Sequence, residues 1–311
     1  MAYELSIINS RAISDPIDFI GQCDAIYQRK IEKAASQIIE NMKHSPIALL
    51  SGPSGSGKTT TAHKIREELQ KRGIATHSIA MDDYFRSRDS YTIPLTPEGA
   101  PDLESPLCVD MELLNDHFTL LGEGRAVIIP KFDFSRQMRI IKPSRSLRLG
   151  KDEVAIFEGI HALNDDITSV HPEAFKLYIS ARSDVVNGDE TCFKGTWMRL
   201  VRRTVRDNLF RGADAASTLG MWANVRRGER KYISPFKDKA DLMFDSSFPY
   251  EVCIMKNLAM DLFSAVPRGV QRYIELQNVM PAFTLFKEIS PDLLAPDSLL
   301  REFVGGGIYD C

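Results

Sequence analysis

The sequence predicts an α/β fold in which a mostly parallel sheet is flanked by helices. Apolar segments of strand length alternate along the chain with segments of helical periodicity, which is typical of strands joined by right-handed helical crossovers. One strand-to-helix junction also contains a complete glycine-rich phosphate loop. At 311 residues, of which 43% are hydrophobic and 26% charged, the chain is long and apolar enough to bury a large core.

The first predicted element is an amphipathic helix that begins after Asp15. Asp is a common helix cap, and Pro16 is tolerated in the first helical turn. The strands predicted after it span residues 47–51, 74–81, 126–129, 154–157 and 175–180, and the predicted helices span residues 58–72, 110–121, 196–209 and 250–263. Residues 84–109 are rich in proline, serine and acidic side chains, and this stretch is too long for a plain connection. We interpret it as a substrate-facing loop region.

These elements divide the chain into three expected parts. Residues 1–44 form an N-terminal helical segment, and residues 45–250 form a core with a lid at about residues 199–230. Residues 251–311 form a C-terminal helical extension, which prolines break into short pieces. The apolar side chains of this extension are expected to pack against the core or, in a homo-oligomer, against a partner subunit.

The phosphate loop spans residues 52–59 and has the pattern G-x-x-x-x-G-K-T. The glycines allow backbone N–H groups to turn inward around phosphate oxygens, while Lys58 reaches the β- and γ-phosphates and the Thr59 hydroxyl ligates Mg²⁺. The following helix directs its N-terminal dipole at the same phosphates. The loop residues expected to bind the nucleotide are Gly52, Ser54, Gly55, Ser56, Gly57, Lys58, Thr59 and Thr60.

Carboxylates follow two of the predicted strands at the edge where a parallel sheet places its chemistry. Asp82 and Asp83 come directly after the second strand, and Glu158 ends a later one. Phosphoryl transfer needs Mg²⁺ and a carboxylate beside the attacking hydroxyl. Asp82 fits the base that orients the hydroxyl and also lies near the metal, and Glu158 fits the outer shell of Mg²⁺. The alternative is that the Asp pair only caps a turn.

Four arginines, at positions 199, 202, 203 and 206, lie three or four residues apart and therefore share one face of a predicted helix. Only Asp207 lies nearby in sequence to balance their charge. Guanidinium groups suit phosphate oxygens, so we interpret the face as a lid that closes over phosphates. The helix is expected to end at Arg211-Gly212, which would act as the hinge. The alternatives are a solvated basic face or an RNA-binding patch.

Composition argues against several classes of protein. The net charge of −3 is unlike that of a general nucleic-acid binder, so nucleic acid is not the expected partner. Five scattered cysteines without C-x-x-C spacing predict neither a disulfide framework nor a zinc site and are typical of a reducing cytosol. No run of eighteen apolar residues and no signal peptide are present. We therefore expect a cytoplasmic protein that does not enter a membrane.

The motifs together resemble the uridine kinase family, within the wider group of uridine kinases, phosphoribulokinases and pantothenate kinases. The segments that carry the resemblance, which spans roughly residues 45–250, are residues 52–59, 81–86, 132–134, 156–160 and 199–212. Residues 226–229, 235–236, 240–241 and 300–306 are similar to bacterial uridine kinase-like proteins that often carry an N-terminal synthetase-like extension. That extension is not found in this sequence.

The resemblance implies a P-loop kinase fold with an Arg-rich lid, and ATP and Mg²⁺ as cofactors. It implies that Asp82 is the base for a ribose 5′-hydroxyl, that Glu158 assists the metal with Thr59, and that the lid contacts phosphates. The lid residues concerned are Arg203, Arg206 and Arg211. The positions implied to bind a small-molecule acceptor are Asp83, Tyr84, Phe85, Glu104, Phe132, Phe134, Gln137 and Arg139.

The sequence departs from the family pattern mainly where a uridine kinase reads its nucleoside. Glu104 stands in Leu-Glu-Ser-Pro where the family has Phe-Asp-His-Pro, and Gln137 stands where the family has a base-contacting histidine. Ala213 and Met221 replace an expected arginine and glutamine of the lid. Because a site built on hydrogen bonds discriminates sharply, these differences leave the identity of the acceptor open.

Three functions follow from these patterns. The first is ATP-dependent phosphoryl transfer to a small hydroxyl acceptor, chiefly the 5′-hydroxyl of a nucleoside. The second is a kinase of a sugar phosphate or other metabolite, which could use the basic side chains of Lys131, Arg136 and Arg139. The third is a nucleotide-dependent RNA-binding or regulatory module.

Overall fold

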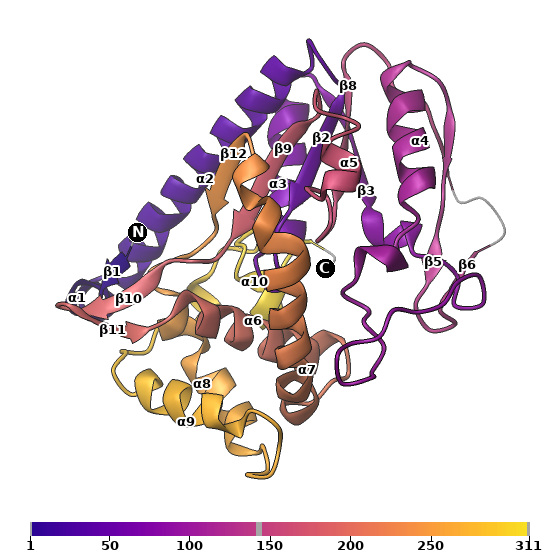
Figure 1. Ribbon diagram of the computed structural model, residues 1–311. Helices are drawn as coiled ribbons and strands as arrows, with labels where there is room; N and C mark the ends of the chain where they lie inside the picture. The colour runs from indigo at the N-terminus through magenta and orange to yellow at the C-terminus, as the bar shows by residue number, and fades with distance from the viewer. Residues whose placement is uncertain (1, 141–144, 310–311) are drawn as a thin grey trace.

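A five-stranded parallel sheet forms the centre of the computed structural model, which describes residues 2–140 and 145–309 (Figure 1). The strand order is β12-β9-β2-β8-β3, and every neighbouring pair is parallel. The strands are β2 (Ile47–Ser51), β3 (Ala75–Ala80), β8 (Glu153–Glu158), β9 (Phe175–Ser180) and β12 (Leu242–Asp245). The predicted α/β class with a mostly parallel sheet is therefore confirmed.

Helices cover both faces of this sheet, and the side chains of the central strand β2 divide between them. Ala48 and Leu50 belong to one hydrophobic cluster and Ile47 and Leu49 to the other, as the two-residue period of a strand requires. Figure 1 shows the two sides, with α2 on one and α4 on the other. The helices are α1 (Leu5–Ser14), α2 (Pro16–Asn41), α3 (Lys58–Lys71), α4 (Met111–Gly122), α5 (Asp165–Thr168), α6 (Gly195–Phe210), α7 (Ala215–Gly228), α8 (Glu251–Ser264), α9 (Tyr273–Phe283) and α10 (Arg301–Val304).

The predicted helix after Asp15 is α2, which begins as its sequence indicates. The Asp15 carboxylate accepts a hydrogen bond from the backbone N–H of Asp18 at 3.0 Å, and Pro16 is the first helical residue. The helix packs on α3, and its side chains Ile31 and Ala34 are fully buried. The N-terminal segment thus contributes directly to the larger hydrophobic cluster.

The strand predicted at residues 126–129 forms, but it does not join the five-stranded sheet. Residues 127–129 form β4 (Val127–Ile129), which pairs antiparallel with β7 (Arg145–Leu147) in a separate ribbon. Strand β12 was not predicted from the sequence, because its apolar run, residues 242–244 between two aspartates, is shorter than the about four to eight residues that indicate a buried strand. The remaining strands are β1 (Ala2–Glu4), β5 (Phe132–Asp133), β6 (Met138–Arg139), β10 (Asp184–Asn187) and β11 (Glu190–Phe193). Short 3₁₀ or π turns are η1 (Met81–Tyr84), η2 (Pro106–Cys108), η3 (Glu229–Ile233), η4 (Ser234–Lys239) and η5 (Pro291–Leu293).

The arginine-rich helix α6 is largely buried, and this corrects the prediction that all four arginines face an external anion. Arg199 forms an ion pair with Glu229, with both N···O distances 2.8 Å. Arg202 is completely buried and forms an ion pair with Glu251 at 2.7 Å. Two of the four guanidinium groups are therefore neutralised by acidic side chains from later elements, which sequence spacing along α6 does not reveal.

Arg202 connects three elements around the phosphate loop. It donates to the carbonyl oxygens of Gly55 and Ser246, at 3.3 and 2.9 Å, and its guanidinium lies over the ring of Phe303 at 5.0 Å. These contacts hold the loop, the end of β12 and α10 against α6.

Replacing Arg202 with methionine is expected to lower the free energy of unfolding by about 3–5 kcal/mol, because Glu251 is left charged and buried without a partner. Urea denaturation would measure the loss. The exposed Arg230 provides a matched control, and Arg230→Met should change stability by no more than about 0.5 kcal/mol. Equal stability of the two variants would contradict the role given to Arg202.

Among the described residues, no helix combines the length and the apolar character needed to cross a bilayer.

Candidate active site

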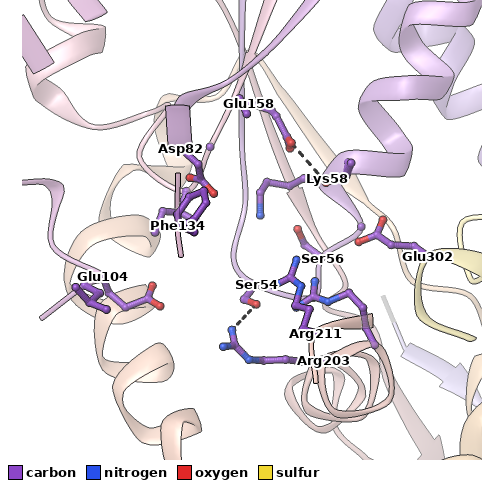
Figure 2. A pocket seen from close by; sticks show the side chains of 18 of the residues that line it. Ser54, Ser56, Lys58, Asp82, Glu104, Phe134, Glu158, Arg203, Arg211 and Glu302 are labelled. Carbon is purple, nitrogen blue, oxygen red and sulfur yellow. Dashed lines mark hydrogen bonds between the residues drawn. The ribbon is translucent and has the colours of Figure 1, made fainter. Parts of the chain in front are cut away.

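A cleft of about 250 Å³ lies at the carboxyl edge of the sheet, where β2, β3 and β8 end (Figure 2). The phosphate loop forms one wall, and α6 with the turn after it supplies Arg203, Arg206 and Arg211. The cleft is lined by Ser54, Gly55, Ser56, Gly57, Lys58, Thr59, Ala80, Asp82, Phe85, Leu103, Glu104, Phe134, Glu158, Gly159, Ile160, Arg203, Arg206, Arg211 and Glu302. Fourteen of the residues predicted from the sequence therefore share one cavity.

The phosphate loop joins buried β2 to the start of α3, as its sequence predicts. Gly55 and Gly57 have positive φ angles of 75° and 78°, a conformation that side chains with a Cβ rarely adopt. A Cβ at Gly52 would collide with the carbonyl oxygen of Ile179. Gly52 therefore packs against β9 behind the loop, and loop residues 54–59 line the cleft.

Lys58 is the central cation of the cleft. Burial lowers the pKa of its ammonium group, while the carboxylates of Glu158, Asp82 and Glu302 act in the opposite direction. Figure 2 shows its side chain extending into the space between Asp82 and the loop. A cation held among three carboxylates suits a site that receives a polyanion, because the incoming phosphates replace solvent around the ammonium.

Glu158 ends β8 and lies beside the phosphate-loop threonine. The Thr59 hydroxyl donates to Glu158 Oε1 at 3.4 Å. Burial raises the pKa of Glu158 to about 6, and Lys58 partly offsets this effect. The carboxylate is thus held, at a cost in free energy, next to a hydroxyl oxygen.

Glu158→Gln is expected to stabilise the ligand-free protein at pH 7.5 by about 1–2 kcal/mol. The folded-state pKa of about 6 lies above the ordinary value of 4.5. The folded protein therefore binds more protons between these values, and its stability falls as pH rises through them. Urea denaturation at pH 7.5 and pH 4.5 would show an advantage that disappears at the lower pH. The exposed Glu123→Gln control should show none, and a destabilised Glu158→Gln at pH 7.5 would contradict the prediction.

Asp82 is the second residue of η1, which directly follows β3, and its side chain is exposed to the cleft. Restricted solvation there raises the pKa of Asp82, while Lys58 lowers it and Asp83 raises it further. Asp83, in contrast, turns away and accepts hydrogen bonds from the backbone N–H of Phe132 at 3.2 Å and from Lys131. The two adjacent aspartates thus have different surroundings.

The arginines of α6 and the following turn that reach the cleft are organised by one buried carboxylate, Asp207. Arg203 and Arg206 pair with it at 3.2 and 2.8 Å, and the half-exposed Arg211 lies 3.7 Å from it. Arg203 also donates to the Ser54 hydroxyl at 2.7 Å. One acidic group serves three guanidinium groups, so the cluster retains net positive charge toward the phosphate loop.

The opposite wall of the cleft is aromatic and acidic. Phe85 and Phe134 pack together with Phe132 in a cluster of rings with centroids 5.0–6.0 Å apart. Burial raises the pKa of Glu104, an effect that Arg203 opposes. The neighbouring Asp102 is buried, and its carboxylate accepts hydrogen bonds from Arg227 and Tyr232. Glu104, not Asp102, is therefore the carboxylate available to a ligand.

Comparison with known proteins agrees with this arrangement of loop, carboxylates and arginines. The sequence model of the "Phosphoribulokinase / Uridine kinase family" matches residues 47–251. The chain belongs to this family. It is therefore an ATP-dependent kinase of a small molecule.

Individual relatives are distant. The uridine kinases of Staphylococcus haemolyticus (strain JCSC1435) and Staphylococcus aureus (strain Newman) are each 27% identical over 214 residues, which cover 68% of this chain and 93% of theirs. A solved structure described as a fructose transport system kinase, from Silicibacter sp. TM1040, is 19% identical with a TM-score of 0.49, and the match covers 69% of this chain and 98% of that one.

In this member of the phosphoribulokinase/uridine kinase family, several residues proposed from sequence lie outside the cleft. Tyr84 is fully buried and bonds to His117, and Arg139 pairs with Asp110 at 3.0 Å. Gln137 is exposed at a turn with φ of 54°. Asp83 and Phe132 lie behind the cleft wall. Instead of lining the cleft, these residues form contacts with neighbouring parts of the protein.

Thr60, predicted to bind the nucleotide, forms hydrogen bonds with Glu302 in this structure. Its hydroxyl donates to Glu302 at 2.7 Å, and its backbone N–H donates to the same oxygen at 3.3 Å. Thr60 is buried beneath the C-terminal segment. A carboxylate from the far end of this kinase thus lies at the N-terminus of α3, where an anion is favoured.

Two charged residues important to the site were not predicted from the sequence: Asp207, which organises the arginines, and Glu302. Asp207 carried a signal, since it was the one acidic residue within the arginine face. The only sequence signal for Glu302 was its position in a short motif before three glycines. No feature of the neighbouring sequence indicates that its side chain reaches the phosphate loop.

Proposed function

We propose that this kinase transfers the γ-phosphoryl group of ATP to the 5′-hydroxyl of a nucleoside, with Mg²⁺ as cofactor. The observation that carries the proposal is that Asp82 and Lys58 face one cleft whose far wall is formed by Phe85, Phe134 and Glu104. A base, a phosphate-binding cation and an aromatic acceptor wall are thus combined. The aromatic rings suit a nucleobase, and the Glu104 carboxylate can accept hydrogen bonds from ribose hydroxyls.

The residues at the strand ends fit a magnesium ion that arrives with the nucleotide. Across the described residues, no three His, Cys, Asp or Glu side chains are grouped to hold a metal alone. Mg²⁺ is usually held by one or two carboxylates together with phosphates and water. Thr59, Glu158 and Asp82 supply oxygen donors of this kind, and the bound ion would neutralise charge on the phosphates.

In the proposed reaction, Asp82 accepts the proton of the attacking hydroxyl and holds its oxygen in line with the terminal phosphorus. Lys58 meets the phosphate oxygens from the loop, and Arg203 and Arg206 meet them from α6. Charge that develops on the transferred group is therefore surrounded by fixed cations, which is the main source of catalysis in phosphoryl transfer.

Charge on the acceptor wall favours a neutral acceptor over a sugar phosphate. Lys131, Arg136 and Arg139, which could have bound a phosphorylated sugar, pair with Asp83, Asp133 and Asp110 instead. The described residues that line the acceptor wall carry no basic group. An RNA-binding role is disfavoured in a similar way, because Arg199 and Arg202 are buried.

ADP release in a coupled assay would test the proposal with a panel of nucleosides, ribulose 5-phosphate and pantothenate, each with and without Mg²⁺. We expect turnover that requires a nucleoside and Mg²⁺ and yields a nucleoside 5′-monophosphate. Stimulation by the phosphorylated sugar alone, or by no acceptor, would contradict the proposal.

A further inference from the structure

A second cavity, of about 290 Å³, adjoins the cleft on the side of the C-terminal segment. It is lined by Phe210, Arg301, Glu302, Gly305, Gly306, Gly307 and Tyr309. Glu302 borders both cavities, and Phe210 directly precedes the lid residue Arg211. The two spaces are therefore neighbours along the end of α6.

The position of Glu302 indicates the direction in which a bound triphosphate leaves the phosphate loop. Figure 2 shows Glu302 on the opposite side of Lys58 from Asp82 and Glu104. The terminal phosphate must face Asp82 for transfer. The other end of the triphosphate then lies toward Thr60, whose N–H and hydroxyl now bind the Glu302 carboxylate. Beyond that point lies the second cavity.

The walls of this cavity suit a flat, hydrogen-bonding ring. Phe210 is 52% exposed and presents its ring beside Gly305, where an added Cβ would lie 3.3 Å from it. In the part of the chain that the structure describes, the backbones of Gly306 and Gly307 make no hydrogen bond. Their N–H and C=O groups are thus available to the edge of a base, and the missing side chains allow close approach.

The segment that carries these glycines is held firmly against the phosphate loop and α3. Leu300 and Phe303 are fully buried, and an added Cβ at Gly57 would lie 2.7 Å from Leu299. The Tyr309 ring stacks on His63 with centroids 5.3 Å apart, and its hydroxyl donates to Glu67 at 2.9 Å. The cavity is therefore largely preformed, which favours binding.

We infer that residues 299–309, together with Phe210, form the binding site for the adenosine half of ATP. The Phe210 ring stacks on the base, the backbone of Gly306 and Gly307 reads its edge, and Glu302 releases Thr60 to the phosphate nearest the ribose. The direction of the triphosphate in this inference rests on the proposed function.

Calorimetric titration of the full chain with ATP and with inorganic tripolyphosphate tests the inference, because only ATP carries a base. Phe210→Ala should raise the Kd for ATP about tenfold, the scale of one lost base–aromatic stack, and change the Kd for tripolyphosphate by less than about twofold. Leu209 is the matched control, since it is 50% exposed, precedes Phe210 and lines neither cavity. Leu209→Ala should leave both constants unchanged.

Two results would overturn the inference: wild-type affinity of Phe210→Ala for ATP, or equal loss of ATP and tripolyphosphate binding. The proposed function fails by a different measurement, namely absence of nucleoside-dependent ADP formation by the wild-type protein. The ratio of the two Kd values remains informative in that case, so the two failures can be told apart.

Discussion

Lys58→Ala is expected to reduce kcat/KM for ATP by about 10²–10³-fold, the scale for removing one preorganised group that meets developing charge. The reason lies in the charge balance of the cleft. Glu158, Asp82 and Glu302 surround the ammonium group, so its removal leaves three carboxylates that repel the incoming phosphates. Affinity for ATP and the rate of transfer should both fall.

Steady-state ADP release and calorimetric titration with ATP would measure the two effects of this substitution. Lys71→Ala is the control, because Lys71 lies in the same helix α3 with a 68% exposed side chain. It should retain wild-type kinetics. Near-normal ATP binding and turnover in Lys58→Ala would mean that the triphosphate does not bind on the glycine loop.

Asp82→Asn is expected to lower kcat by about 10²–10⁴-fold, the usual scale for loss of a general base. An amide has nearly the shape of a carboxylate but cannot accept the proton of the attacking hydroxyl. ATP should still bind, since Lys58 and the loop are intact and one negative charge near the phosphates is gone. The effect should therefore appear in kcat and not in the Kd for ATP.

Single-turnover phosphorylation of the nucleoside, together with ATP titration, would separate these two quantities. Asp83→Asn is a demanding control, because Asp83 is the next residue but bonds to the Phe132 N–H and to Lys131 outside the cleft. It should lower kcat by less than about tenfold, since it contacts no reacting atom. A near-full rate in Asp82→Asn would contradict the base assignment.

The cleft illustrates how a functional site is held at a cost in stability. Restricted solvation raises the pKa of Asp82, Glu104 and Glu158 and lowers that of Lys58, so each charged form is disfavoured by its surroundings. Neighbours of opposite charge offset only part of this effect. Bound nucleotide and metal would replace the lost solvation, and the same groups that weaken the free protein would then stabilise the complex.

Four of the five strands of the parallel sheet, the phosphate loop and the carboxylates at the strand ends could be predicted from the sequence. Each of these depends on short-range features: alternating apolar segments, glycines at fixed spacing, and a polar residue directly after a buried strand. The ends of parallel strands meet at one edge of a sheet, so Asp82 and Glu158 come together although 76 positions separate them.

Which charged side chains line the cleft depends on long-range packing between elements. Helical spacing places Arg199, Arg202 and Arg203 on one face but does not say what covers it, and the partners Glu229 and Glu251 lie 30 and 49 residues away from their arginines. Glu302 reaches Thr60 across 242 residues. Contacts of this kind depend on how finished elements pack, and no local pattern in the chain encodes them.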